Sequence, residues 1–125
     1  MGWIGFDIDG TLAIDLPNRS NDTEIGEPIQ PMVDKARELI NQGKDVRIFS
    51  ARAFQPDLYL RTDVYHAIRK WCIKHIGRPL PIVYYKDHNL DWYYDDKAIA
   101  VEYNTGKILK VINEEEPDNF IGLTD

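Results

Sequence analysis

Apolar residues occur along this chain in short runs that are typical of buried strands. Residues 3–8 are mostly apolar and end abruptly in charged and small polar residues, which predicts a strand whose end delivers polar groups. Residues 46–49, 82–85 and 92–94 predict three more strands, and residues 98–101 predict another. The pattern therefore predicts five strands.

Two longer segments between the first three strands have the spacing of amphipathic helices. The first begins at Pro31 and stops at Gly43, and its apolar face consists of Met32, Val33, Ala36, Leu39 and Ile40. The second begins near Thr62 and closes at Gly77, with an apolar face of Val64, Tyr65, Ile68, Trp71, Cys72 and Ile76. Because strands alternate with helices, we expect an α/β fold with a mainly parallel sheet and right-handed crossovers.

Polar clusters follow four of the predicted strands, at the edge where a parallel sheet places its ligands. The clusters are Asp7 with Asp9, Ser50 with Arg52, Lys86, and Asp95 with Asp96. A carboxylate can attack a phosphate ester if a divalent cation screens its approach, and Mg²⁺ prefers oxygen ligands. The clusters therefore predict a site that holds both Mg²⁺ and a phosphate group.

Length and composition narrow the class of protein. With 125 residues we expect one domain over the whole chain, with a core of about residues 2–103 and a C-terminal extension over 104–125. No apolar run approaches the roughly 18–20 residues of a membrane span, and we find no signal peptide. The lone cysteine, Cys72, fits a reducing compartment, so we expect a cytoplasmic protein that does not bind membranes.

The net charge of the chain limits the kinds of partner that it can bind. The formal net charge of −6 argues against strong binding of duplex nucleic acid. It is still compatible with a local cluster of basic residues around a phosphate-binding site. Some of the acidic residues lie in the segment 114–118, which we interpret as a solvated tail.

Two connecting segments are unusual. Residues 15–30 are rich in Asp, Asn, Ser, Gly and Pro and predict a loop or flap beside the first strand end. Only residues 87–91 separate Lys86 from Trp92. Such a link can join two parallel strands only if it is extended and the strands are short.

The clusters and their order resemble the haloacid dehalogenase superfamily of phosphatases. The segment DIDGT at residues 7–11 is similar to the DxDGT motif of that family. Ser50 and Lys86 stand where the family has its second and third motifs. Asp95 and Asp96 stand at the fourth, in a stretch similar to that of phage-like and nucleotidase-like members. The resemblance covers residues 4–102.

The resemblance implies a role for each matching residue. It implies that Asp7 is the nucleophile, that Asp9 is the general acid and base, and that Lys86 neutralises both nucleophile and phosphate. The residues that it implicates in phosphate binding are Thr11, Ser50, Ala51, Arg52 and Lys86. The Mg²⁺ ligands that it implies are Asp7, Asp9 through its backbone carbonyl, Asp95 and Asp96. Of the last pair, Asp96 is favoured as the direct ligand and Asp95 as the residue that orients Lys86.

The resemblance also implies a fold and a kind of substrate. It implies a single Rossmann-like, three-layer α/β/α domain with a mainly parallel five-stranded sheet. The gaps at residues 12–30 and 53–85 leave no room for a cap domain, so we expect an open site. An open site admits small or macromolecular phosphate esters, such as nucleotides, nucleic-acid ends and sugar phosphates. It is also compatible with a homo-oligomer in which a neighbour supplies a lid.

We therefore predict a Mg²⁺-dependent phosphatase that hydrolyses phosphate monoesters through an aspartyl-phosphate on Asp7. One alternative is a phosphotransferase or mutase on the same fold. Another is a non-catalytic phosphate-binding scaffold, which would be expected to have lost Asp7 or Asp9. A phosphoacceptor signalling domain is disfavoured because such a domain has its phosphorylated aspartate on the third strand. In this chain the acidic pair Asp7 and Asp9 follows the first strand.

Several residues have simpler interpretations. Arg52 is as readily a structural salt-bridge partner as a phosphate ligand, and Cys72 belongs to the apolar face of its helix. Packing of strands explains the aromatic residues better than a base-stacking platform does; these residues are Tyr84, Tyr85, Trp92, Tyr93 and Tyr94. Phe54, Tyr59 and residues 57–61 lie near the predicted mouth and are candidates for substrate selection.

Overall fold

The computed structural model describes residues 2–19, 21–54 and 60–110. The chain divides into two compact units, Met1–Tyr94 and Asp95–Asp125, and the division falls inside the predicted core of residues 2–103. Tyr59, most of the 57–61 segment and the acidic segment 114–118 lie outside the described residues.

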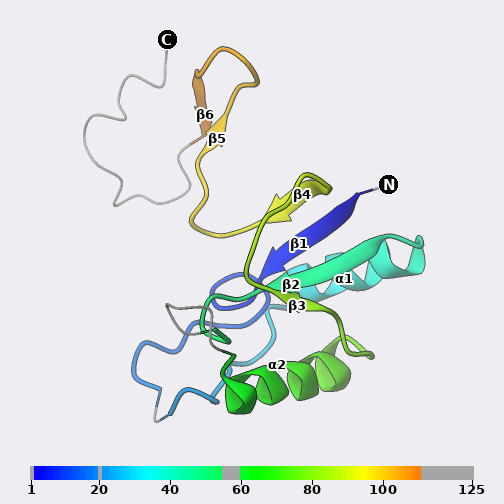
Figure 1. Ribbon diagram of the computed structural model, residues 1–125, viewed down its shortest axis with the longest axis vertical. Helices are drawn as coiled ribbons and strands as arrows, with labels where there is room; N and C mark the ends of the chain where they lie inside the picture. Colours follow the sequence, from blue (N-terminus) through cyan, green and yellow to red (C-terminus); the bar gives the residue numbers. More distant parts are fainter. Residues whose placement is uncertain (1, 20, 55–59, 111–125) are drawn as a thin grey trace. The chain divides into compact units, whose positions relative to one another are not determined.

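The first unit contains a parallel four-stranded sheet in the order β3-β2-β1-β4 (Figure 1). Its strands are β1 (Trp3–Asp7), β2 (Asp45–Phe49), β3 (Ile82–Val83) and β4 (Leu90–Tyr94). β1 pairs on one side with β2, where Asp7 faces Phe49, and on the other side with β4, where Phe6 faces Tyr94. The predicted α/β fold with a mainly parallel sheet is confirmed.

The predicted fifth strand does not belong to this sheet. β5 (Ala100–Val101) pairs antiparallel with β6 (Ile108–Lys110) and forms a separate two-stranded sheet in the second unit. A turn folds the chain back between them: Asn104 has a φ of 66°, and the Glu102 amide donates to the Lys107 carbonyl at 2.8 Å. A five-stranded parallel sheet is therefore not confirmed, because β5 pairs with a strand that follows it closely in the chain.

Both predicted helices are present. α1 (Gln30–Asn41) has Pro31 in its first turn, where a missing N–H costs no helical hydrogen bond. α2 (Thr62–His75) buries Val64, Ile68, Trp71 and Cys72, as its apolar spacing predicts. Burial raises the pKa of the Cys72 thiol to about 12, so this cysteine stays neutral in the core. In the described part of the chain, no helix has the length and apolar character needed to span a membrane.

The two helices cover the same face of the sheet. Ile4 and Phe6 alternate with Trp3 and Gly5 along β1, so the two pairs lie on opposite faces. One core cluster joins Ile4 and Phe6 to the buried residues of both α1 and α2. Trp3 is buried but lies outside that cluster. Helices on both faces, and with them the expected three layers, are therefore not confirmed in the described residues.

A link without a helix, residues 84–89, crosses the other face and ends in a turn at residues 88–89. Two of its contacts are with Trp3: the indole Nε1–H donates to Asp87 at 2.8 Å, and the Trp3 amide donates to the Asn89 carbonyl at 2.8 Å. The indole hydrogen bond holds the pKa of Asp87 below its usual value. Passing from β3 to β4 spans three strand spacings, about 14 Å. From Val83 to Leu90 the chain must also return four residues along the sheet, about 13 Å, which makes a diagonal of about 19 Å. Seven residue steps of roughly 3.3 Å reach that far, so the short link suffices without a helix.

The position of Ile68 generates a test of this core. We expect Ile68→Ala to lower the free energy of unfolding by about 2–5 kcal/mol, because the side chain is fully buried between α2 and the sheet. Ile73→Ala on the same helix is the matched control, since that side chain is 43% exposed, and it should cost about 0.5 kcal/mol or less. Equal losses in urea denaturation would contradict the packing described here.

Candidate metal and phosphate site

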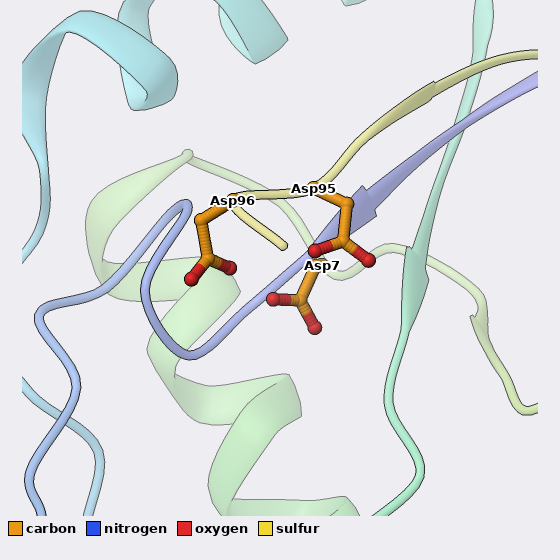
Figure 2. Close-up of side chains that lie close together, drawn as sticks. All are labelled: Asp7, Asp95 and Asp96. Carbon is orange, nitrogen blue, oxygen red and sulfur yellow. The ribbon is translucent and has the colours of Figure 1, made fainter. Parts of the chain in front are cut away.

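Three carboxylates gather where β1 and β4 end. Phe6 and Tyr94 are register partners, so the next residue along each strand, Asp7 and Asp95, continues from neighbouring strand ends. One carboxylate oxygen each from Asp7, Asp95 and Asp96 lies within 4.8 Å of the other two (Figure 2). Three of the four predicted metal ligands are therefore brought together, while the Asp9 carboxylate is not part of this group.

The donor set of this group suits a hard divalent cation. All three residues are half-buried, and three negative charges so close together repel one another strongly outside bulk water. Mg²⁺ takes a few carboxylates and completes its shell with water or substrate oxygens. The Lys97 amide donates to Oδ1 of Asp95 at 2.8 Å, which orients this carboxylate and leaves its second oxygen for a cation.

A tight turn after β1 places Asp9 and Thr11. The amides of Leu12 and Ala13 both donate to the Ile8 carbonyl, at 3.0 and 2.9 Å, and the Gly10 amide donates to the Ala13 carbonyl at 2.7 Å. Gly10 has a φ of 90°, a conformation that residues with a Cβ rarely adopt. The turn therefore needs glycine at this position, and it buries Thr11 against the sheet end.

The carboxylate of Asp9 is held by arginines. Arg52 donates from Nε to Oδ2 at 2.9 Å and from Nη2 to Oδ1 at 3.1 Å, which occupies both oxygens of Asp9. Arg19 approaches Oδ1 to 3.6 Å from the flap. The sequence left open whether Arg52 is a salt-bridge partner or a phosphate ligand, and in this structure its guanidinium makes a salt bridge with Asp9.

Arg52 also ties down the flap. Its Nη1 donates to the Asp22 carbonyl at 2.6 Å, and its Nη2 donates to the Glu24 carbonyl at 3.2 Å. One guanidinium therefore connects the end of β2, the turn after β1 and the middle of the flap. Arg61, at the start of α2, adds a more exposed contact with Asp22 at 3.0 Å.

The flap is pinned at its base as well. The Ile14 amide donates to the Glu27 carbonyl at 2.8 Å, and the Ile29 amide donates to the Leu12 carbonyl at 2.7 Å. A Cβ on Gly26 would lie 2.0 Å from the Ile14 carbonyl oxygen, so only glycine allows the two segments to approach this closely. The buried Trp71 indole of α2 donates to the Gly26 carbonyl at 2.9 Å.

Ser50 lies directly after β2, beside the end of β1. Its amide donates to the Val83 carbonyl at 2.9 Å, which fixes the backbone next to β3. The residue is 3% exposed, and its Oγ atom has no hydrogen-bond partner among the described residues. Buried hydroxyls in proteins are normally satisfied, so this oxygen is available to a ligand atom. Ala51, the next residue, is exposed.

Lys86 lies on the face of the sheet that carries Asp7. Its Nζ is 4.3 Å from the ring centroid of Tyr93 and 5.8 Å from that of Phe49. These two residues are the register partners of Gly5 and Asp7. The exposed amino group therefore rests on aromatic rings beside the strand end, where it can swing toward a bound anion.

Two features of the site were missed from the sequence. Arg19 reaches Asp9 from the flap, and Trp71 holds the flap through Gly26. A flap rich in small polar residues gives no periodicity from which its side-chain partners could be read. Trp71 was recognised only as part of an apolar face, because nothing in the sequence pattern indicates the direction of its N–H.

No protein-family model, curated protein or solved structure matches this chain.

The contacts of Arg52 generate a prediction about the flap. We expect Arg52→Met to lower the free energy of unfolding by about 1–3 kcal/mol, because it leaves Asp9 and two flap carbonyls without their donor. Hydrogen–deuterium exchange of the Ile14 and Glu24 amides should accelerate. Arg61→Met is the control and should have a smaller effect, since its partners are exposed. Unchanged exchange in Arg52→Met would show that the flap is held by other contacts.

Proposed function

We propose that this chain is a Mg²⁺-dependent phosphatase of the haloacid dehalogenase type, with a Rossmann-like fold, that hydrolyses phosphate monoesters through an aspartyl-phosphate on Asp7. The observation that carries the proposal is the group of Asp7, Asp95 and Asp96, whose oxygens lie within 4.8 Å of one another at a strand end. A nucleophilic carboxylate needs a cation beside it to approach a phosphate dianion, and this group supplies both functions.

The unsatisfied hydroxyl of Ser50 supports a phosphate ligand. A buried hydroxyl without a partner costs about 1–3 kcal/mol, and a phosphate oxygen would remove that cost. Ser50 follows Phe49, the register partner of Asp7, so a phosphate held there sits next to the nucleophile. The exposed Lys86 amino group can neutralise the phosphate from the face of the sheet that carries Asp7.

Catalysis then proceeds in two displacements. An oxygen of Asp7 attacks phosphorus while the bond to the leaving oxygen breaks, and Asp9 gives its proton to that oxygen. A water molecule next attacks phosphorus; Asp9 takes a proton from it, and the bond between phosphorus and Asp7 breaks to restore the carboxylate. When bound by Asp7, Asp95 and Asp96, Mg²⁺ supplies charge neutralisation during both displacements.

Asp9 can do this only if it exchanges a partner. Arg52 occupies both of its carboxylate oxygens, at 2.9 and 3.1 Å. One of these hydrogen bonds must therefore open, so that the released oxygen takes up a proton before the first displacement and donates it to the leaving oxygen. The other would keep Asp9 aimed at the substrate, because the arginine is itself fixed by two flap carbonyls.

The first test is Asp7→Asn. We expect release of phosphate from p-nitrophenyl phosphate to require Mg²⁺, to stop in EDTA, and to fall by roughly 10³-fold or more in the variant, because the nucleophile is lost. Mg²⁺ should also raise the melting temperature of the parent protein more than that of the variant. Asp34→Asn, on the exposed side of α1, is the control. Turnover in EDTA, or near-parental turnover in Asp7→Asn, would refute the mechanism.

The second test is Asp9→Asn. We expect turnover to slow by about 10²–10⁴-fold, the usual contribution of general acid–base catalysis. Intact-protein mass spectrometry after addition of substrate should reveal a phosphoryl group retained on Asp7, since water attack is slowed as well. Asp15→Asn, another flap-side carboxylate that contacts Arg19, should react like the parent protein. A fast Asp9→Asn variant would remove Asp9 from its assigned role.

A further inference from the structure

Positive charge is concentrated in one part of this acidic chain. From Val64 to Lys86 there is no aspartate or glutamate, although the whole protein has a net charge of −6. That segment carries Arg69, Lys70, Lys74, Arg78 and Lys86. Among the described residues, none of these five makes a salt bridge. The charge is therefore available to an anionic partner.

Part of this charge lines a groove. The space between α2 and the flap has a volume of about 260 Å³. Its charged and polar lining residues are Thr23, Glu27, Lys70, Lys74 and His75. Lys70 and Lys74 are exposed and lie one helical turn apart, so their amino groups project from the same side of α2. The floor includes Trp71 and Gly26, which are joined by the buried indole hydrogen bond.

The flap connects the groove with the candidate site. Thr23 and Ile25 line it, and the residue between them, Glu24, accepts a hydrogen bond from Arg52 through its carbonyl. Arg52 in turn holds Asp9. An anionic chain with its end at Asp7 and Asp9 can therefore continue along the flap to Lys70 and Lys74.

We propose that this groove binds the sugar–phosphate backbone of a single-stranded polynucleotide. Taken together with the proposed function, on which this part rests, the substrate is the phosphorylated end of such a strand. Lys70 and Lys74, the two lysines of the groove, lie about 6 Å apart along the helix axis, which suits two successive phosphates better than a single one. The groove is far too small for a duplex, in keeping with the net negative charge of the chain.

Exposed aromatic rings stand beside the phosphate site. Tyr84 follows Val83, whose carbonyl accepts the Ser50 amide, and the Tyr84 ring packs against Phe54 and Tyr85. Tyr84 and Tyr85 are 37% and 43% exposed, and both lie beyond the end of β3 rather than within the sheet. Proteins hold single strands without sequence preference by stacking bases on aromatic rings and by contacting the backbone with basic side chains.

An anionic membrane fits these features less well. A helix that lies on a membrane uses its apolar face for insertion. The apolar face of α2 is buried in the core, and Ile73 is the only large apolar residue that this helix exposes.

The decisive experiment measures binding without chemistry. Fluorescence anisotropy would follow a labelled 20-nucleotide oligothymidylate without a terminal phosphate, in EDTA. We expect salt-sensitive binding that Lys70→Gln/Lys74→Gln weakens about tenfold or more. Lys35→Gln/Lys44→Gln removes the same charge from the α1 region and should weaken it much less. Equal weakening by both pairs, no binding by the parent, or binding only to phosphatidylserine vesicles would overturn the proposal.

A second arm connects the groove to catalysis. The ratio of kcat/KM for a phosphorylated oligonucleotide to kcat/KM for p-nitrophenyl phosphate should fall in Lys70→Gln/Lys74→Gln and not in the control pair. A constant ratio would show that the groove does not serve this substrate. If the parent protein hydrolyses neither compound, the proposed function fails, while the binding measurement still decides whether the groove holds a polynucleotide.

Discussion

The structure depends on one strand that is paired in parallel on both sides. β1 lies between β2 and β4, so its carboxyl end is flanked by the carboxyl ends of both neighbours. That arrangement sets Asp7 between Ser50, which follows β2, and Asp95, which follows β4. Carboxylates brought together at a half-buried edge repel one another, so the pairing of β1 assembles the group of carboxylates on which the proposed metal site rests.

The flap is coupled to the reacting groups through charge rather than through apolar packing. Arg52 joins Asp9 to two flap carbonyls, and Arg19 approaches the same carboxylate from within the flap. Any ligand that competes for Asp9 therefore also competes for the bonds that hold the flap. Trp71 and Gly26 fix the base of the flap on α2, so the flap is held both at its base and at Arg52.

Sequence patterns predicted the elements whose signal is local. Apolar periodicity identified β1, β2, α1 and α2, because each buries one face and shows it in its spacing. The carboxylates of the candidate site were also predicted, since parallel strands deliver their next residues to one edge. Predictions failed where the pattern of one segment does not identify its partner: β5 pairs with the nearby β6, which was not predicted, and the link 84–89 lies where a second helical layer was expected. The partners of Arg52 depend on how the flap folds back, which no spacing encodes.

The chain order of the sheet has a consequence for biosynthesis. β1 is translated first, but its neighbour β4 lies at the other end of the first unit. The paired residues Phe6 and Tyr94 are therefore separated by nearly the whole length of that unit. Pairings over such long stretches of chain are slow and come late in folding. During translation β1 can therefore pair with β2 long before β4 has been synthesised, and the edge of β1 that later pairs with β4 stays unpaired until then. Asp7 is joined by Asp95 and Asp96 only when that edge is paired, so a truncated or stalled chain cannot assemble this group of three carboxylates.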